Sequence, residues 1–307
     1  MISSKKKSFS KVLRNIVITV LVVVISTFAV TKIVYDAVFK RYDCVENHCS
    51  VSDISGKEIK FSSGENRLHG CLYGNTGEIL VVFIPGFHAC IDDYLPQIKS
   101  FTDSGFGVFA FDPTGSGKSG GDTAVGFSQI IYDLDAALET VRKNDNFGFK
   151  HTVLFGHSRG GYAACCAVKD GYDISAIVSV GGINSAMEGV IAPVAETVGF
   201  LAYSNYPMLW AYQAMLFGTE TMGRDAAEII SSTGVPTLIV HGNNDQQVPR
   251  DEYSVISHRS EITSENAEYI ICDTPGMDGH IDLLFDGDTA NEQLMNSIKD
   301  FYLRSVG

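Results

Sequence analysis

Continuous apolar runs alternate with amphipathic segments over most of the chain. The runs EILVVFIPG, GVFAFD and TVLFG are bounded by turn residues, as is typical of strands buried on both faces of a sheet. Between them, apolar residues recur at helical spacing. This is clearest at 127–141, where one face carries Ile130, Ile131, Leu134, Ala137, Leu138 and Val141. The pattern predicts an α/β fold, with a mainly parallel sheet and helices on both faces.

Further elements follow from the same reading. EIKF and RLHGCLY predict an opening hairpin, and helices are expected at 94–102, 160–168 and 290–303. The segments ISAIVSVGG and VPTLIVHG read as strands, and AEYIICD as the last one. Residues 184–232 interrupt the alternation with about fifty residues that lack a strand pattern and hold the only tryptophan, Trp210. We expect a helical insertion there, the alternative being ordinary core helices.

The amino-terminal segment is the most apolar part of the chain. It has no charge from Asn15 to Thr31, and Lys32 can snorkel, which gives the length of about twenty residues that a membrane-spanning helix needs. We expect a basic tail at 1–14, a transmembrane anchor at 15–36, a polar stalk at 37–56 and the main domain at 57–307. A cleaved signal peptide and a buried helix are the alternatives, and Thr27-Phe28-Ala29 is a poor cleavage site.

Flanking charge predicts how this segment is oriented. Five basic residues precede the apolar run, so the amino end should stay in the cytoplasm and the main domain should lie outside, at the cell membrane. Asn-x-Ser/Thr is absent from the sequence, which fits a bacterial surface protein.

Charge and cysteine usage exclude some functions. Residues 1–41 carry a net charge of +7, which leaves −20 for the rest of a chain whose formal net charge is −13. So acidic a main domain argues against binding nucleic acid, whose phosphates require a basic surface. The seven cysteines have no zinc-type spacing, and no metal site is expected. Cys44 and Cys49 are close enough to form a disulfide, or are two free thiols; Cys165 and Cys166 read as buried helix residues.

One pentapeptide suggests a nucleophile. GHSRG, Gly156–Gly160, fits G-x-S-x-G between a predicted strand and a predicted helix. So tight a turn strains the serine backbone, and glycines two residues before and after avoid steric conflict. The turn would lift the Ser158 hydroxyl above the carboxyl edge of the sheet, beside a helix amino end that can hold negative charge. The alternative is a plain glycine-rich turn.

The residues that would activate this serine follow in the expected order. A serine needs a base, the base needs an orienting acid, and around this motif the acid and then the histidine come after the serine. Asp245 lies just past one buried strand and His280 in a loop past the last. Competing candidates are less well placed. They are His157, which should pack against the sheet, His241 at a strand end, His88 before the serine, and Asp273 and Asp278 in the wrong segment.

Backbone amides should stabilise the oxyanion. One is the amide of Arg159, and the other is expected from the loop after LVVFIPGFHA, at Phe87, which could also line the acyl pocket. A separate segment, FDPTGSGKSGG, contains Gly117-Lys118-Ser119 and looks like a phosphate loop. That loop needs glycine at position 112, where this chain has Asp112, so the alternative is a loop that crosses the top of the sheet.

Taken together, these segments resemble the α/β-hydrolase superfamily from about Gly56 to the end of the chain. PGF, FDPTGSGKSGG, GHSRGG, HGNNDQQVP and GH stand in the order and spacing of its serine aminopeptidase-like and monoglyceride lipase-like members. Thr114 departs from the usual arginine, and Pro85-Gly86 from the common His-Gly. The resemblance implies hydrolysis of esters or amides through an acyl-serine without a cofactor. It also implies that the insertion is a lid shaping the acyl pocket.

The sequence therefore predicts a membrane-anchored serine hydrolase that cleaves carboxylic esters with an apolar acyl group. Ser158, Asp245 and His280 would form its triad, and its partners would be a small ester or amide and the membrane. A serine peptidase or amidase and a non-catalytic binding protein with this fold are the alternatives. The lid would supply an apolar wall from Phe200, Tyr203, Tyr206, Met208, Trp210, Met215 and Phe217.

Overall fold

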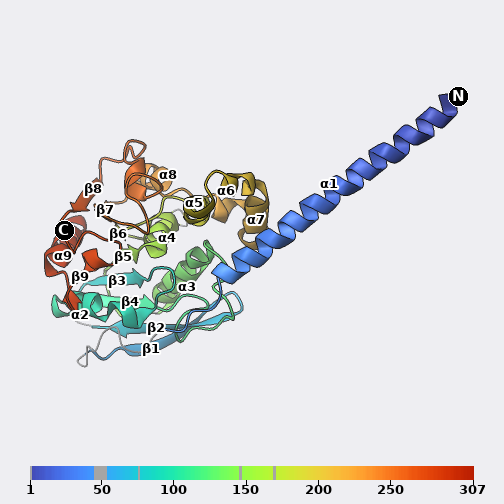
Figure 1. Ribbon diagram of the computed structural model, residues 1–307. Coiled ribbons are helices and arrows are strands. Elements are labelled where there is room, and N and C mark those ends of the chain that lie inside the picture. Colours follow the sequence, from blue (N-terminus) through green and yellow to red (C-terminus); the bar gives the residue numbers. More distant parts are fainter. Residues whose placement is uncertain (1, 45–53, 75–76, 145–146, 169–170) are drawn as a thin grey trace.

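The computed structural model describes residues 2–44, 54–74, 77–144, 147–168 and 171–307, and its centre is an eight-stranded sheet (Figure 1). The strand order is β1-β2-β4-β3-β5-β6-β7-β8. Only β1 with β2 and β2 with β4 pair antiparallel; the other pairs are parallel. The predicted fold class and the opening hairpin are confirmed. The strands are β1 Lys57–Ser63, β2 Asn66–Tyr73, β3 Ile79–Ile84, β4 Gly107–Phe111, β5 His151–His157, β6 Ala176–Val180, β7 Thr237–Gly242 and β8 Ala267–Cys272.

Helices cover both faces of the sheet, and the apolar strands divide their side chains between two cores. In β3, Leu80, Val82 and Ile84 pack in one core, whereas Val81 and Phe83 pack in the other. This alternation is why a strand buried on both faces has no polar positions. Helices α3 Gln129–Lys143, α4 Arg159–Ala167 and α8 Ala226–Thr233 cover the first face, and α2 Leu95–Asp103 and α9 Glu292–Val306 the second.

A two-stranded ribbon follows the large sheet. Strands β9 Phe285–Asp286 and β10 Thr289–Ala290 pair antiparallel. The prediction that AEYIICD is the last strand is therefore correct for the large sheet and wrong for the chain. A strand of two residues is too short to show a periodicity in the sequence.

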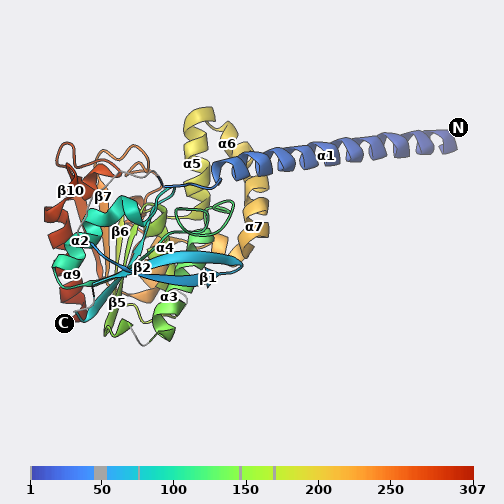
Figure 2. The same ribbon diagram turned by 90° about the horizontal axis from the view of Figure 1, so that it is seen from below.

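The amino-terminal helix, α1 Ile2–Val38, projects from the body of the molecule (Figures 1 and 2). Its segment Ser10–Val38, with a mean hydropathy of 2.5, is long and apolar enough to cross a membrane. Its last turns touch the rest of the chain. There the Thr31 hydroxyl lies 3.0 Å from Asn205 Oδ1, and Lys32 Nζ donates to the Tyr212 hydroxyl over 3.2 Å.

Residues 39–44 correct the expectation of a polar stalk, because they lie on the body. The Tyr42 amide donates to the Gly115 carbonyl over 2.9 Å, and the Gly117 amide donates back to the Tyr42 carbonyl over 3.1 Å. Cys44 forms a disulfide with Cys90, with 6.3 Å between their Cα atoms. The proposed Cys44–Cys49 bridge is thus wrong for Cys44, and Cys49 lies outside the described residues.

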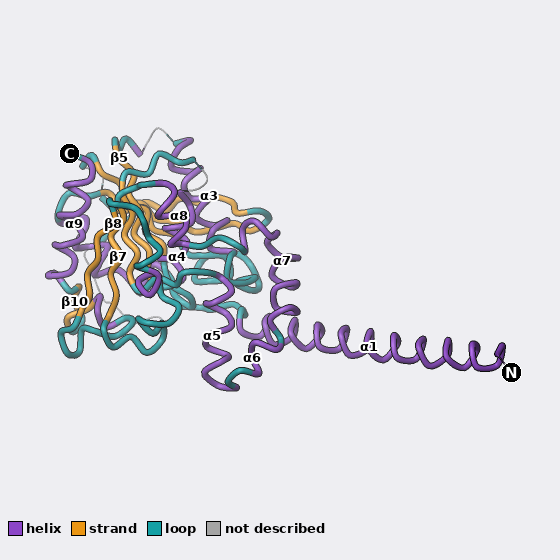
Figure 3. The backbone as a smooth tube through the Cα atoms, turned by 90° about the horizontal axis from the view of Figure 1, so that it is seen from above, coloured by secondary structure: helices purple, strands orange, loops and turns teal. Residues whose placement is uncertain are grey.

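Residues 184–232 contain helices and isolated bridges but no strand. They form α5 Ala186–Val198, α6 Leu201–Ser204, α7 Tyr206–Met222 and most of α8. Helix α8 packs on α4 as part of the main helical layer. Helices α5, α6 and α7 stand outside that layer, beside the base of α1 (Figure 3).

Candidate active site

Ser158 sits in a strained turn between β5 and α4. Its φ of 57° is in the left-handed region, which a residue with a side chain rarely adopts. The two flanking glycines are required by space. A Cβ on Gly156 would lie 2.1 Å from the Gly160 carbonyl oxygen, and one on Gly160 would lie 2.2 Å from that of Ile84. The local geometry is therefore the one that the pentapeptide predicted.

Asp245 and His280 come together at the carboxyl edge of the sheet. His280 Nδ1 is 2.7 Å from Asp245 Oδ2, and both side chains are buried. Asp245 Oδ1 accepts from the amides of Gln247 and Val248, over 2.9 and 2.8 Å. Burial alone would raise the pKa of Asp245, but hydrogen bonds from His241, His280 and Val248 outweigh it and hold that pKa well below its usual value. The carboxylate stays ionised and fixes the imidazole through Nδ1.

His241 supports the same carboxylate. It is fully buried at the end of β7, with Nε2 2.8 Å from the Val248 carbonyl oxygen and 3.3 Å from Asp245 Oδ2. The strand-end placement expected from the sequence is therefore observed. Its proximity to Asp245 was not anticipated.

Two backbone amides near Ser158 are unused. Within the described residues, the amides of Phe87 and Arg159 donate to no acceptor, whereas the Ser158 amide donates to the Val180 carbonyl over 2.8 Å. Phe87, Ser158 and Arg159 line the same cavity. The positions predicted for oxyanion donors thus carry free N–H groups next to the serine.

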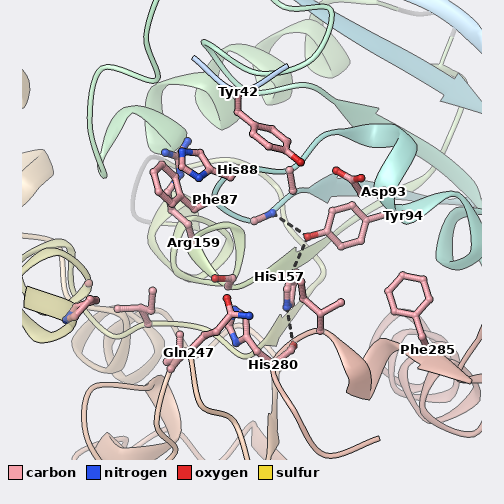
Figure 4. A pocket seen from close by; sticks show the side chains of 18 of the residues that line it. Tyr42, Phe87, His88, Asp93, Tyr94, His157, Arg159, Gln247, His280 and Phe285 are labelled. Atoms are coloured by element: carbon pink, nitrogen blue, oxygen red, sulfur yellow. Dashed lines mark hydrogen bonds between the residues drawn. The ribbon is translucent and has the colours of Figure 1, made fainter. Parts of the chain in front are cut away.

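A buried hydrogen-bond chain links the loop after β3 to the loop that carries His280 (Figure 4). The Gly86 amide donates to the Tyr94 hydroxyl over 3.2 Å, and this hydroxyl lies 2.8 Å from His157 Nδ1. His157 Nε2 lies 3.0 Å from the His280 carbonyl oxygen. Burial, then the charge of nearby His280, lowers the pKa of His157 to about 3. A neutral His157 with its proton on Nε2 satisfies both contacts.

The sequence does not predict this chain of contacts. His157 was expected to pack, which it does, but Tyr94 was not singled out. A buried tyrosine eight residues after Gly86 carries no sequence signal of its own. The partner it reaches is fixed by the fold.

Ser158 and His280 share a cavity of about 730 Å³. Its apolar wall comes from Phe87, Phe127, Ile183, Gly189, Pro193 and Val248. The structure places none of the predicted lid residues Tyr203, Tyr206, Met208, Trp210 and Phe217 in this lining. Phe217 is buried against the Tyr132 ring, and Trp210 is 41 % exposed. The insertion does reach the cavity, but through α5 rather than through its aromatic helices.

In the described part of the chain, no hydrogen bond joins the Ser158 hydroxyl to His280. Catalytic hydrogen bonds are often long without a substrate and tighten once one is bound.

The segment that resembles a phosphate loop has the wrong polarity for phosphate. The carbonyl oxygens of Gly117, Ser119 and Gly121 accept from the Arg41 guanidinium, over 2.6, 2.9 and 2.9 Å. A phosphate cradle presents N–H groups instead. The geometry therefore does not support phosphate binding, and the carbonyls of this loop instead hold the cationic side chain of Arg41, from the segment after α1.

One cluster in the described residues has ligand-type side chains, at Cys44, Cys90 and Asp93. Both sulfurs are used in the disulfide, and Asp93 accepts from the Cys90 amide over 2.9 Å. Disulfide sulfurs are not the thiolates that bind metals. The cluster does not fit a metal site.

Comparisons with known proteins place this geometry in context. The family model for serine aminopeptidases (S33) matches residues 77–213, which include Ser158 but end before Asp245 and His280. An esterase from Pyrococcus furiosus is 18 % identical, covers 88 % of this chain and 100 % of its own, and superposes with a TM-score of 0.67. No curated protein matches the chain in sequence.

Two further solved structures come from bacteria. Est1E of Butyrivibrio proteoclasticus is 16 % identical, with 82 % of this chain and 99 % of that one covered and a TM-score of 0.61; a second structure of it contains ferulic acid. An esterase from Exiguobacterium antarcticum is 16 % identical over 81 % of this chain and 99 % of its own, with a TM-score of 0.57. At these identities the likeness is one of fold.

Proposed function

We propose that this chain, which has the α/β-hydrolase fold, is a serine hydrolase that cleaves carboxylic esters through an acyl-serine intermediate. One observation carries the proposal. Ser158 in its strained turn opens onto the same cavity as His280, whose ring is held by the ionised, buried Asp245. A nucleophile, a base and an orienting acid are the parts that acyl transfer requires.

Acylation uses each group at a defined atom. His280 Nε2 takes the proton of Ser158 as the serine oxygen attacks the substrate carbonyl, while Asp245 holds the Nδ1 proton and favours the imidazolium. The negative charge that forms on the carbonyl oxygen is stabilised by the amides of Phe87 and Arg159. His280 then gives its proton to the departing alcohol.

Deacylation repeats these steps with water. His280 removes a proton from water, the resulting oxygen attacks the acyl-serine, and the same two amides stabilise the second tetrahedral intermediate. The acid is released and Ser158 recovers its proton. No cofactor takes part in either half.

Ester and amide cleavage share this chemistry, and one observation favours amide cleavage. The family model that matches residues 77–213 is that of serine aminopeptidases. The apolar wall of the cavity and the esterase neighbours support an ester with an apolar acyl chain, which we place first. The amide remains the second candidate.

A labelling experiment followed by a substrate panel tests the proposal. A fluorophosphonate should label the wild-type protein and not Ser158→Ala, and 4-nitrophenyl esters should be cleaved faster than aminoacyl nitroanilides. Ser158→Ala and His280→Ala should each lose at least about 10³-fold in kcat, and the double variant little more, because the two residues act as a unit. Labelling of Ser158→Ala would show that another residue is the nucleophile. Faster turnover of the nitroanilides would favour the peptidase.

We also propose that α1 anchors the protein in the cell membrane, with its amino end in the cytoplasm and the catalytic domain outside. The apolar segment and the basic residues before it support this orientation. The Cys44–Cys90 disulfide fits an oxidising compartment. Because Tyr42 lines the cavity only four residues after α1 ends, such an anchor would hold the cavity close to the membrane surface.

A further inference from the structure

Arg159, the residue after Ser158, places a buried cation at the wall of the cavity. Its side chain is 2 % exposed, and it is among the residues that line the cavity. Two of its guanidinium nitrogens, Nε and Nη1, have no hydrogen-bond partner among the residues that the structure describes. Buried donors are almost always satisfied in native proteins, so two unused donors on a residue that lines the cavity are unusual enough to suggest a ligand for this side chain.

The protein does not neutralise this cation by direct contact. The Asp133 carboxylate attracts its charge from a distance. The Asp133 carboxylate is already occupied, because it accepts from the Thr114 amide and hydroxyl, both over 2.8 Å, and from Gln129 Nε2 over 3.0 Å. Burial lowers the pKa of Arg159 to about 10, which still leaves the guanidinium charged at neutral pH.

An aromatic ring holds the guanidinium in place. Its carbon Cζ lies 5.4 Å from the centroid of the Phe87 ring, and that ring also stacks on His88. Figure 4 shows Phe87, His88 and Arg159 on one side of the cavity and Gln247 and His280 on the other. A guanidinium lying against a ring has fewer orientations, so its N–H fork is organised before a ligand arrives.

We propose that Arg159 binds a carboxylate at the far end of an otherwise apolar acyl chain, so that the preferred substrates are half-esters of dicarboxylic acids. This rests on the proposed function. The leaving group must accept a proton from His280 and therefore departs on that side, which directs the acyl part toward Arg159. A planar carboxylate matches the guanidinium fork better than any neutral group.

The length of the Arg159 side chain limits the length of the acyl part. The guanidinium and the amide expected to bind the oxyanion belong to the same residue, so the carboxylate and the scissile carbonyl are separated by one arginine side chain. An extended arginine side chain is about as long as an acyl chain of six carbons, so it sets an upper limit of about six carbons for the acyl part. Its methylene groups would pass along Phe87 and Phe127.

A matched pair of substrates tests this with the full-length protein. Mono-4-nitrophenyl adipate and 4-nitrophenyl hexanoate have acyl chains of equal length and differ only in the terminal carboxylate. The ratio of their kcat/KM values, adipate over hexanoate, should be above one in the wild type and should fall about 10- to 100-fold in Arg159→Met. Arg159→Lys should restore part of the ratio, because it keeps the charge and loses the fork.

Binding gives a readout that does not depend on turnover. Free adipate should raise the melting temperature of Ser158→Ala and should not do so once Arg159→Met is added. Without adipate, Arg159→Met should melt no lower than the wild type, because it removes an unpartnered buried charge. If Arg159→Met is insoluble, Arg159→Gln serves for the same comparisons.

Arg224 is the matched control. It is also buried, its Nη1 donates to the Cys166 carbonyl over 3.0 Å, and it is not among the residues lining the cavity. Arg224→Met should lower the melting temperature and leave the substrate ratio and the adipate effect unchanged.

The outcomes separate this proposal from the proposed function. If the wild type is labelled by fluorophosphonate but prefers hexanoate, with a ratio that Arg159→Met does not change, the carboxylate subsite is wrong and the hydrolase stands. If neither labelling nor turnover occurs, the proposed function fails. In that case the melting experiment still decides the subsite, and a lack of Arg159-dependent stabilisation by adipate overturns it.

Discussion

At the scale of single residues, the positions around Ser158 are supported by buried polar contacts that reach well beyond the predicted triad. The chain from Gly86 through Tyr94 and His157 to the His280 carbonyl joins the two loops that would hold the oxyanion and the base. Tyr94 is therefore a positioning residue. Among the described residues, the Tyr94 hydroxyl forms no hydrogen bond with Ser158 or with the His280 ring.

Tyr94→Phe should weaken both stability and catalysis. It leaves His157 Nδ1 and the Gly86 amide without their partner, which should lower the free energy of unfolding by about 1–3 kcal/mol. It should also lower kcat about tenfold with little change in KM, because the base and oxyanion loops lose their link. Urea unfolding and ester kinetics measure the two effects.

Tyr302→Phe is the control for that prediction. The Tyr302 hydroxyl is equally buried and donates to the Leu154 carbonyl over 2.7 Å, away from the cavity. It should lose comparable stability and keep its kcat. An equal loss of kcat in both variants would show that Tyr94 acts only through general stability.

His157 should make the fold sensitive to mild acid. Its pKa is about 3 in the folded chain and about 6.5 when unfolded, so the unfolded state binds the extra proton between these values. Stability should therefore be complete above pH 6.5 and fall as the pH drops, by about 1.4 kcal/mol per unit below pH 6. Asp245 adds its own loss only below about pH 4, its unfolded pKa.

The difference in the free energy of unfolding between wild type and His157→Gln isolates this effect. Urea unfolding between pH 7 and pH 4.5 should show the gap in stability narrowing toward acid, because the variant has no proton to take up at that position. Parallel pH profiles for the two proteins would contradict a neutral, buried His157.

At the scale of elements, the insertion contacts the cavity through α5, whereas its aromatic residues lie on α6 and α7. Trp210 is 41 % exposed, whereas Gly189 and Pro193 of α5 line the cavity together with Ile183, which precedes the insertion. Trp210→Ala should accordingly leave the acyl-chain preference unchanged. Ile183→Phe should shift the preference toward shorter chains by filling the cavity.

A series of 4-nitrophenyl esters from acetate to decanoate measures this preference. Melting temperatures of both variants control for loss of folding. A shift in preference with Trp210→Ala alone would mean that α7 moves onto the cavity when a substrate binds.

At the scale of the whole molecule, the last turns of α1 and residues 39–44 are part of the body, so an anchor would be joined rigidly to the catalytic domain. Surface protease on intact cells should reach the domain, and alkaline carbonate should not release it. A soluble product that begins near Val30 would show a cleaved signal. Protection of the domain in intact cells would reverse the orientation and remove the oxidising environment that the Cys44–Cys90 bridge suits.

The sequence alone determined the α/β fold class and the turn around Ser158, because both depend on local and periodic signals. Strands buried on both faces read as unbroken apolar runs, and Gly156 and Gly160 mark a turn that other residues cannot make. The fold that the ordered motifs implied is the one that the solved structures share, and a serine aminopeptidase family model matches residues 77–213. The choice of Ser158, Asp245 and His280 as the triad remains a proposal, although Ser158 and His280 line one cavity and the buried Asp245 contacts the His280 ring.

Tertiary structure alone decided which side chains meet across the chain. Cys44 pairs with Cys90 rather than with its near neighbour because residues 39–44 dock on the loop after β4, a contact that no local pattern encodes. The insertion contributes to the cavity wall through α5 because the orientation of a helix, and not its composition, selects the residues that face inward. Arg159 looked like one residue of a motif, and only packing shows its guanidinium buried against Phe87 with unused donors. Such facts depend on contacts between residues far apart in the chain, which sequence spacing does not measure.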